Sequence, residues 1–142
     1  MNASAIKVFN RTIEKTNAWI SDLMAELGWE EPERSYHALR AVLHALRDRL
    51  SVQEAADLSS QLPMLVRGIY YEGWSPSGKP VKERKKEEFL AHIADAFRGD
   101  LRVNAEHVAR SVFKVIASHV TSGEVEDVKL TLPPQIRALW PE

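Results

Sequence analysis

Positively charged side chains lie along one edge of each of two predicted helices, with a spacing that could hold an anion. The first edge consists of His37, Arg40, His44 and Arg47, and the second of His107, Arg110 and Lys114. Steps of three and four residues place each set in one sector of a helix. Guanidinium and imidazolium groups bind phosphate or carboxylate through charge-assisted hydrogen bonds. If both edges face a common groove, the sequence predicts an anion site formed by His37, Arg40, His107 and Arg110.

The same charges have a second interpretation. Amphipathic helices normally expose a polar side, so the two edges could simply face solvent. They could also pair with Glu54 and Asp57, and with the acidic residues seventy positions further on, Glu124 and Asp127. Both interpretations are open at this point.

The middle of the chain combines aromatic and basic residues. The aromatic residues are Tyr70, Tyr71 and Trp74, and the cations that follow are Lys79, Lys82, Arg84, Lys85 and Lys86. Aromatic rings beside cations can stack on nucleic-acid bases while the cations contact phosphates, and they can also anchor a protein interface. Alternatively, the rings hold a loop against the helices and the lysines begin a solvent-exposed helix face.

Signatures of catalysis and of metal binding are missing from the sequence. There is no cysteine, no G-x-S-x-G motif and no glycine-rich phosphate or dinucleotide loop. The five histidines form no pair with the four-residue spacing of helical chelators, and His37 and His44 would be about 10 Å apart along a helix. We therefore expect no metal and no cofactor, and we favour a function other than catalysis, with an enzyme of unfamiliar type as an open alternative.

The elements that position these residues occur twice. Residues 15–70 align with residues 85–140 at a constant offset of seventy, without a gap. Such an alignment predicts two copies of one structural unit. The segment 72–84 between them contains glycine, proline and serine and is expected to be a loop.

A helix-capping motif and a proline corner recur in both copies. Ser51-Val-Gln-Glu54 and Thr121-Ser-Gly-Glu124 are capping boxes, in which the hydroxyl accepts from the glutamate amide and the carboxylate returns to the cap. An aspartate–arginine pair would then clamp the two helices that meet at each Leu-Pro sequence. The predicted structural corner comprises Ser51, Glu54, Asp57, Leu62, Pro63 and Arg67, and in the second copy Thr121, Glu124, Asp127, Leu132, Pro133 and Arg137.

Apolar residues recur at steps of three and four along most of the chain, and no segment alternates as a strand would. Helices are expected over residues 4–27, 33–50 and 51–61 and after Pro63, with Gly28 and Pro32 ending the first. The second copy repeats this plan. The prediction is an all-α fold: a compact bundle of about eight helices, built from two tandem four-helix repeats with a pseudo-twofold relation, in a single domain over residues 1–142.

Bulk composition narrows the class of protein. With 142 residues and 44% hydrophobic side chains, the chain can form an ordinary core without disulfides. A net charge of −1 argues against nucleic acid or an anionic membrane as the main partner. Residues 1–15 show no apolar signal-peptide core, and no apolar run is long enough to span a membrane. A cytoplasmic location is expected.

The segment from Leu39 to Ile69, with Tyr-Tyr-Glu-Gly-Trp after it, resembles a small bacterial family known as domain of unknown function 2267. The shared features are an Ala-Val-Leu helix and the corner Leu-x-x-x-Glu-Ala-x-x-Leu-x-x-Gln-Leu-Pro, which ends at Pro63. The second copy departs from this pattern at Thr131, where the corner has glutamine. The resemblance implies a compact helical bacterial protein and brings no activity, cofactor or catalytic residue.

These observations favour a non-enzymatic module that binds a protein partner or a second copy of itself, with Tyr71 and Trp74 at the interface. The alternative is an anion-binding protein whose ligand is a nucleotide, a phosphorylated molecule or nucleic acid. That protein would use the two cationic edges together with the basic segment from Lys79 to Lys86.

Overall fold

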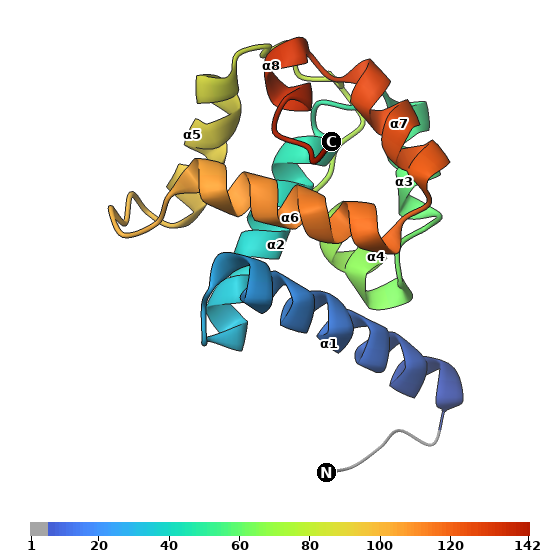
Figure 1. The fold of residues 1–142 in the computed structure, drawn as a ribbon. Coiled ribbons are helices and arrows are strands. Elements are labelled where there is room, and N and C mark those ends of the chain that lie inside the picture. Colours follow the sequence, from blue (N-terminus) through green and yellow to red (C-terminus); the bar gives the residue numbers. More distant parts are fainter. Residues whose placement is uncertain (1–5) are drawn as a thin grey trace.

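The computed structural model describes residues 6–142, in which eight helices and no strands form a compact bundle (Figure 1). The predicted all-α class and number of helices are confirmed. The helices are α1 (Lys7–Leu27), α2 (Pro32–Arg47), α3 (Val52–Ser59), α4 (Met64–Tyr71), α5 (Lys86–Ala96), α6 (Ala105–His119), α7 (Ser122–Thr131) and α8 (Pro134–Arg137). Residues 1–5, which include the start of the predicted first helix and of the segment assessed as a signal peptide, lie outside the described part. No helix within residues 6–142 is long and apolar enough to cross a membrane.

Local sequence signals set the helix ends. Gly28 closes α1 in the left-handed conformation, with φ of 74°. The sequence predicts that Pro32 helps to end this helix, but Pro32 is instead the first residue of α2. The first N–H groups of a helix have no acceptor within it, so proline costs no hydrogen bond at this position. α2 ends at Arg47, before the expected Leu50, because residues 48–50 tighten into turns.

The two long inner helices, α2 and α6, cross at the centre, and the outer helices pack across the two halves of the chain (Figure 1). α1 contacts both α2 and α6, and α5 contacts the same two helices. α4 packs on α2, α8 packs on α5, and α3 meets α7. Each half therefore supplies an outer helix to the central helix of the other half.

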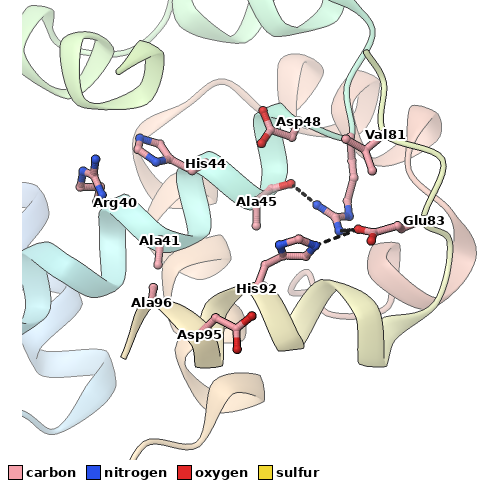
Figure 2. Close-up of a pocket in the computed structure, with 11 residues that line it drawn as sticks. Arg40, Ala41, His44, Ala45, Asp48, Val81, Glu83, His92, Asp95 and Ala96 are labelled. Carbon is pink, nitrogen blue, oxygen red and sulfur yellow. Dashed lines mark hydrogen bonds and ion pairs between the residues drawn. The ribbon is translucent and has the colours of Figure 1, made fainter. Parts of the chain in front are cut away.

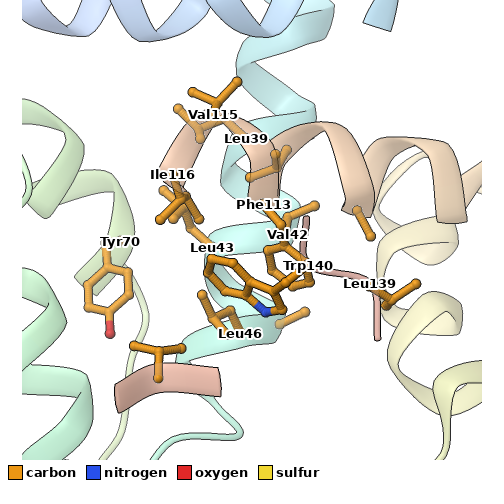
Figure 3. Close-up of a cluster of buried hydrophobic side chains, with 14 of the residues drawn as sticks. Leu39, Val42, Leu43, Leu46, Tyr70, Phe113, Val115, Ile116, Leu139 and Trp140 are labelled. Carbon is orange, nitrogen blue, oxygen red and sulfur yellow. The ribbon is translucent and has the colours of Figure 1, made fainter. Parts of the chain in front are cut away.

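The crossing of α2 and α6 is apolar and closed (Figure 3). Leu39 and Leu43 of α2 share one fully buried cluster with Phe113 and Ile116 of α6. Trp140 stacks on Phe113, with ring centroids 4.2 Å apart and planes at 7°. Burial of these large side chains is the main force that holds the two halves together.

Candidate functional site

The first cationic edge binds the end of α4. Arg47 is buried, and its Nη1 donates to the carbonyls of Tyr70 and Glu72, both at 2.6 Å. His44 Nε2 donates to the Ile69 carbonyl at 2.7 Å. The last carbonyls of a helix have no partner within it, so Arg47 and His44 cap the C-terminus of α4. Burial lowers the pKa of His44, which favours the neutral ring.

The exposed members of this edge have weaker contacts. Arg40 Nε pairs with Glu72 Oε1 at 2.8 Å, and this hydrogen bond holds the pKa of Glu72 below its usual value. Both side chains are well exposed, so the pair contributes little to stability. His37 is exposed, and its ring lies 5.2 Å from that of Tyr36. Arg40 is therefore engaged at the end of α4, next to the cap formed by Arg47.

The second cationic edge also binds helix ends. His107 Nε2 donates to the carbonyl of Leu27, the last residue of α1, at 3.2 Å. Arg110 Nη1 donates to the carbonyl of Ala138, directly after α8, at 3.2 Å. Its Nε bonds Glu106 on the same helix at 2.9 Å. These contacts fix the ends of α1 and α8 against α6.

The contacts of the two edges correct the predicted common groove. Each edge is directed at a different helix end, and the closed apolar crossing of α2 and α6 lies between the halves. The acidic partners also differ from those considered, since Lys114 pairs with Glu26 at 3.2 Å and not with Glu124 or Asp127. Most of the acceptors are main-chain carbonyls, which every residue carries, so the sequence holds no signal for them.

Ser51 and Thr121 cap α3 and α7 as the pattern predicts. Their hydroxyl oxygens accept from the amides of Glu54 and Glu124 at 3.1 and 3.3 Å. The return half of the capping box is a correction, because the Thr121 N–H donates to Gln61 Oε1 at 2.8 Å, and the carboxyl groups of Glu54 and Glu124 lie close enough to act on each other. Oε2 of each is buried with no donor group in reach. Packing of α3 on α7 brings the pair together, and nothing in the local sequence could reveal it.

Two arginines brace the Leu-Pro corners through main-chain carbonyls. The bonds, at 2.8 to 3.0 Å, run from Arg67 to Ser59 and Leu62, and from Arg137 to Lys129 and Leu132. The predicted aspartate partners are wrong, since Asp57 accepts from Gln53 at 2.9 Å. The clamp is thus present, with main-chain carbonyls of α3, of α7 and of the two corners in place of the side chains of Asp57 and Asp127.

Removing either arginine tests this clamp. Arg67→Ala and Arg137→Ala should each lower the free energy of unfolding by about 1–2 kcal/mol, because two carbonyls lose a charged donor. Urea denaturation followed by circular dichroism measures the change. Arg84→Ala, which removes an exposed arginine, is the matched control and should change stability by less than about 0.5 kcal/mol. Equal stabilities for all three variants would contradict the assigned role.

A polar cavity of about 390 Å³ opens between α2 and α5 (Figure 2). Arg49 and His92 both bond Glu83, His92 through Nε2 at 2.9 Å. Asp48 and Asp95 add negative charge to the wall. Cations and anions alternate around the cavity, and its central groups already bond one another. The cavity therefore shows no preference for a ligand of either charge.

The aromatic residues of the central segment pack inward. Tyr70 is buried, and its hydroxyl donates to the Ala55 carbonyl at 2.9 Å. The Tyr71 hydroxyl bonds Ser59 Oγ at 2.9 Å, and the ring of Trp74 lies 5.3 Å from that of Tyr71. These contacts hold the loop on α3, so Tyr71 and Trp74 are engaged within the chain.

The basic residues after the loop are spread along an extended segment. Lys86 Nζ pairs with Glu106 at 3.1 Å, and its N–H bonds Gln135 at 2.8 Å. The others are Lys79, which is half-buried, and Lys82, Arg84 and Lys85, which are exposed. They do not converge on one site with the cationic edges.

An apolar surface that the sequence interpretation missed lies at the start of α1. The core-facing stripe of α1 is buried at Thr16, Trp19 and Leu23. Seven residues before Thr16, on the same face, Phe9 is 45% exposed. Figure 1 shows this end of α1 projecting past α4, beyond the other helices. Helical periodicity identifies the stripe, but it cannot show where the bundle stops covering it.

Six of the nine large apolar side chains that are most exposed within residues 6–142 gather here. We call them the α1–α4 surface: Ile6, Val8, Phe9, Ile13, Met64 and Leu65. Thr12 Oγ1 accepts from the Leu65 N–H at 2.9 Å, which ties the two helices together. A hollow of about 170 Å³ lies between them, next to a second of about 410 Å³ beside Trp19, and Lys15 and Pro63 line both. Val8 and Met64 of the α1–α4 surface line the first hollow together with Arg11 and Lys15, so the hollow lies beside the exposed stripe that carries Phe9 and Ile13.

These features define an all-helical bundle in which most chemistry-bearing residues hold helix ends and corners. No three histidine or acidic side chains of the described residues come together in a group that could hold a metal ion. The chain belongs to the family described as uncharacterized conserved protein (DUF2267), whose model matches residues 16–139. The resemblance noted from the sequence is thereby confirmed, and the exposed first turns of α1 precede the matched region. No curated protein matches the sequence.

Proposed function

We propose that this protein is a non-enzymatic interaction module that binds an acidic amphipathic helix of another protein on the α1–α4 surface. The observation that carries the proposal is the uncovered continuation of the core stripe of α1 at Phe9. Contiguous exposed apolar side chains of this kind mark interaction sites. An exposed apolar stripe on a helix suits a partner helix that packs apolar residues against it at steps of three and four.

A row of cations borders the apolar stripe and argues for an acidic partner. Lys7, Arg11 and Lys15 follow one another at four-residue steps and so lie along one line of the helix. None of the three has an ion-pair partner within residues 6–142. Glu14 is the single acidic residue of this segment. A helix whose apolar stripe is bordered by aspartate and glutamate would complement both features.

A second copy of the chain fits this surface less well. A symmetric pair uses the same patch on both subunits. The rows formed by Lys7, Arg11 and Lys15 would then approach each other, and like charges across an interface disfavour association. Self-association is therefore an outcome that the experiment must separate from partner binding.

Selection of displayed peptides tests the proposal. Random peptides of about fifteen residues, long enough for four helical turns, are selected on the immobilised protein. Enriched sequences should combine apolar residues at helical spacing with aspartate and glutamate. Phe9→Ala/Ile13→Ala should reduce binding of these peptides at least tenfold, and Leu101→Ala, which removes another exposed apolar side chain, should leave it unchanged.

Two further measurements distinguish an acidic partner helix from a second copy of the chain. Arg11→Ala/Lys15→Ala should weaken acidic peptides more than neutral ones, and light scattering should show a monomer. Loss of a dimer in Phe9→Ala/Ile13→Ala would identify a second copy as the occupant and overturn the acidic partner. A monomer that enriches no peptide would refute the interaction function.

We also infer that the chain is a single domain of two tandem four-helix units with a pseudo-twofold relation. Reciprocal contacts at the offset of seventy support this inference. The ring of Trp19 stacks on that of His119, with centroids 4.8 Å apart. At the equivalent positions, the guanidinium of Arg49 lies over the ring of Phe89, 5.1 Å from its centroid.

A further inference from the structure

The contact between α3 and α7 joins the two halves of the chain through polar groups. Gln61, at the end of α3, bonds the cap of α7 twice. Its Nε2 donates to Thr121 Oγ1 at 3.0 Å, and its Oε1 accepts from the Thr121 N–H at 2.8 Å. The neighbouring contact is the pair of carboxyl groups of Glu54 and Glu124. The contact between α3 and α7 shares no residue with the α1–α4 surface, so what we infer for it does not depend on the proposed function.

The two carboxyl groups lie in an environment that disfavours two negative charges. Glu124 is 9% exposed, and Oε2 of both glutamates is buried without a donor group in reach. The acceptor atoms of two carboxylates repel, whereas one added proton converts the contact into an O–H···O hydrogen bond. A single shared proton therefore satisfies the geometry that the backbone imposes.

The charged groups around the pair reinforce this requirement. Asp57 of α3 and Asp127 of α7 both act on Glu124 and disfavour its ionised form. Tyr70 of α4 lies near both glutamates, and burial raises its pKa, so the phenol stays neutral. Burial first, then the hydrogen bond with Glu54 and the nearby charges, raise the pKa of Glu124 to about 7.

We propose that the α3–α7 contact is proton-dependent: one proton shared by Glu54 and Glu124 closes it, and loss of that proton separates the two helices. The protein then has a built-in response to mild alkalinisation at the contact between its halves. The closed state has one carboxyl protonated, and the open state has two carboxylates that water can reach. The crossing of α2 and α6 stays packed in both states, since it is apolar.

The sign of the effect follows from the folded-state pKa, which is raised. The stabilisation is complete below the pKa of an unfolded glutamate and is lost as the pH rises through about 7. For values of 4.5 unfolded and about 7 folded, the unfolding equilibrium constant should increase about thirtyfold between pH 5.5 and 8.5. His44 acts in the opposite direction, because its folded pKa is lowered. Comparison with a variant therefore isolates the glutamate pair.

The experiment compares unfolding constants from urea denaturation at pH 5.5 and 8.5 with those of Glu124→Gln. The amide donates to Glu54 at either pH, so this variant should lose most of the thirtyfold pH effect. Glu126→Gln changes an exposed glutamate on the same helix, with 64% side-chain exposure, and should retain it. Hydrogen exchange in wild type should accelerate at α3 and α7 above pH 7 by more than the intrinsic rate increase.

Carbon-detected NMR titration of the glutamate carboxyls in the wild-type protein gives a reading that needs no variant. One carboxyl of the pair should titrate near pH 7. If every glutamate titrates below about pH 5.5, near the usual range, the proposal is overturned. An unchanged pH dependence in Glu124→Gln would also overturn it. If Glu124→Gln fails to fold, Glu54→Gln and the NMR titration decide the question.

Discussion

Replacing Phe113 with alanine is expected to lower the free energy of unfolding by about 3–5 kcal/mol, the range for aromatic truncations in packed cores. Phe113 is fully buried where α2 and α6 cross. Its ring stacks on Trp140 at 4.2 Å and also contacts Phe89, with centroids 5.9 Å apart. Truncation removes both ring contacts and leaves a cavity at the point where the halves meet. Denaturation by urea, followed by circular dichroism, measures the loss.

Phe9→Ala is the matched control for this prediction. Phe9 has the same side chain but is 45% exposed, so its truncation should change stability by less than about 0.5 kcal/mol. The same substitution, combined with Ile13→Ala, is the variant expected to reduce peptide binding at least tenfold in the proposed function. If Phe113→Ala lowers the free energy of unfolding by less than about 1.5 kcal/mol, the crossing can collapse around the missing ring, and the tight packing of α2 on α6 is contradicted.

Arg47→Met should cost about 2–4 kcal/mol of unfolding free energy. Methionine retains most of the length of the apolar stem but donates no hydrogen bond. The carbonyls of Tyr70 and Glu72, each now bonded at 2.6 Å, would then lose their charged donor. Arg47 is 5% exposed, so water cannot readily replace it. Thermal and urea denaturation provide the measurement.

Arg40→Met is the control for this second prediction, since the Arg40 side chain is 41% exposed and its pair with Glu72 is largely in solvent. Its effect should stay below about 1 kcal/mol. Hydrogen exchange at the end of α4 should accelerate in Arg47→Met and remain near wild type in Arg40→Met. Equal effects of the two substitutions would mean that the buried carbonyls do not depend on Arg47.

The helices could be predicted because their signals are local. Apolar residues at steps of three and four mark each helix, Gly28 closes α1, and the hydroxyls of Ser51 and Thr121 accept from the amides three residues on. These signals depend on the backbone geometry of a few neighbouring residues. Errors at helix ends, such as the early end of α2 at Arg47, arise where a turn competes with one more helical step.

The partners of the polar residues could not be predicted because their acceptors carry no sequence signal. Arg47 and Arg67 were assigned to charged groups or solvent, but they bind carbonyls, which are placed by the meeting of two helices. Glu54 matches the local capping motif, but its carboxyl group interacts with Glu124 of α7, a helix in the other half of the chain. The exposure of Phe9 depends on how far α1 extends beyond its neighbours, which is a property of the assembled bundle.

The packing of α1 on α6, and of α5 on α2, has a consequence for how such a chain could arise and fold. A polypeptide with the first four helices alone would keep α2 and α4 against α1 but would lack α6, and could find an equivalent of α6 only in another molecule. Fusion through the segment 72–84 converts that encounter into an intramolecular one, with an effective concentration in the millimolar range for a short linker. Because the linker joins the two halves, their assembly no longer depends on the protein concentration.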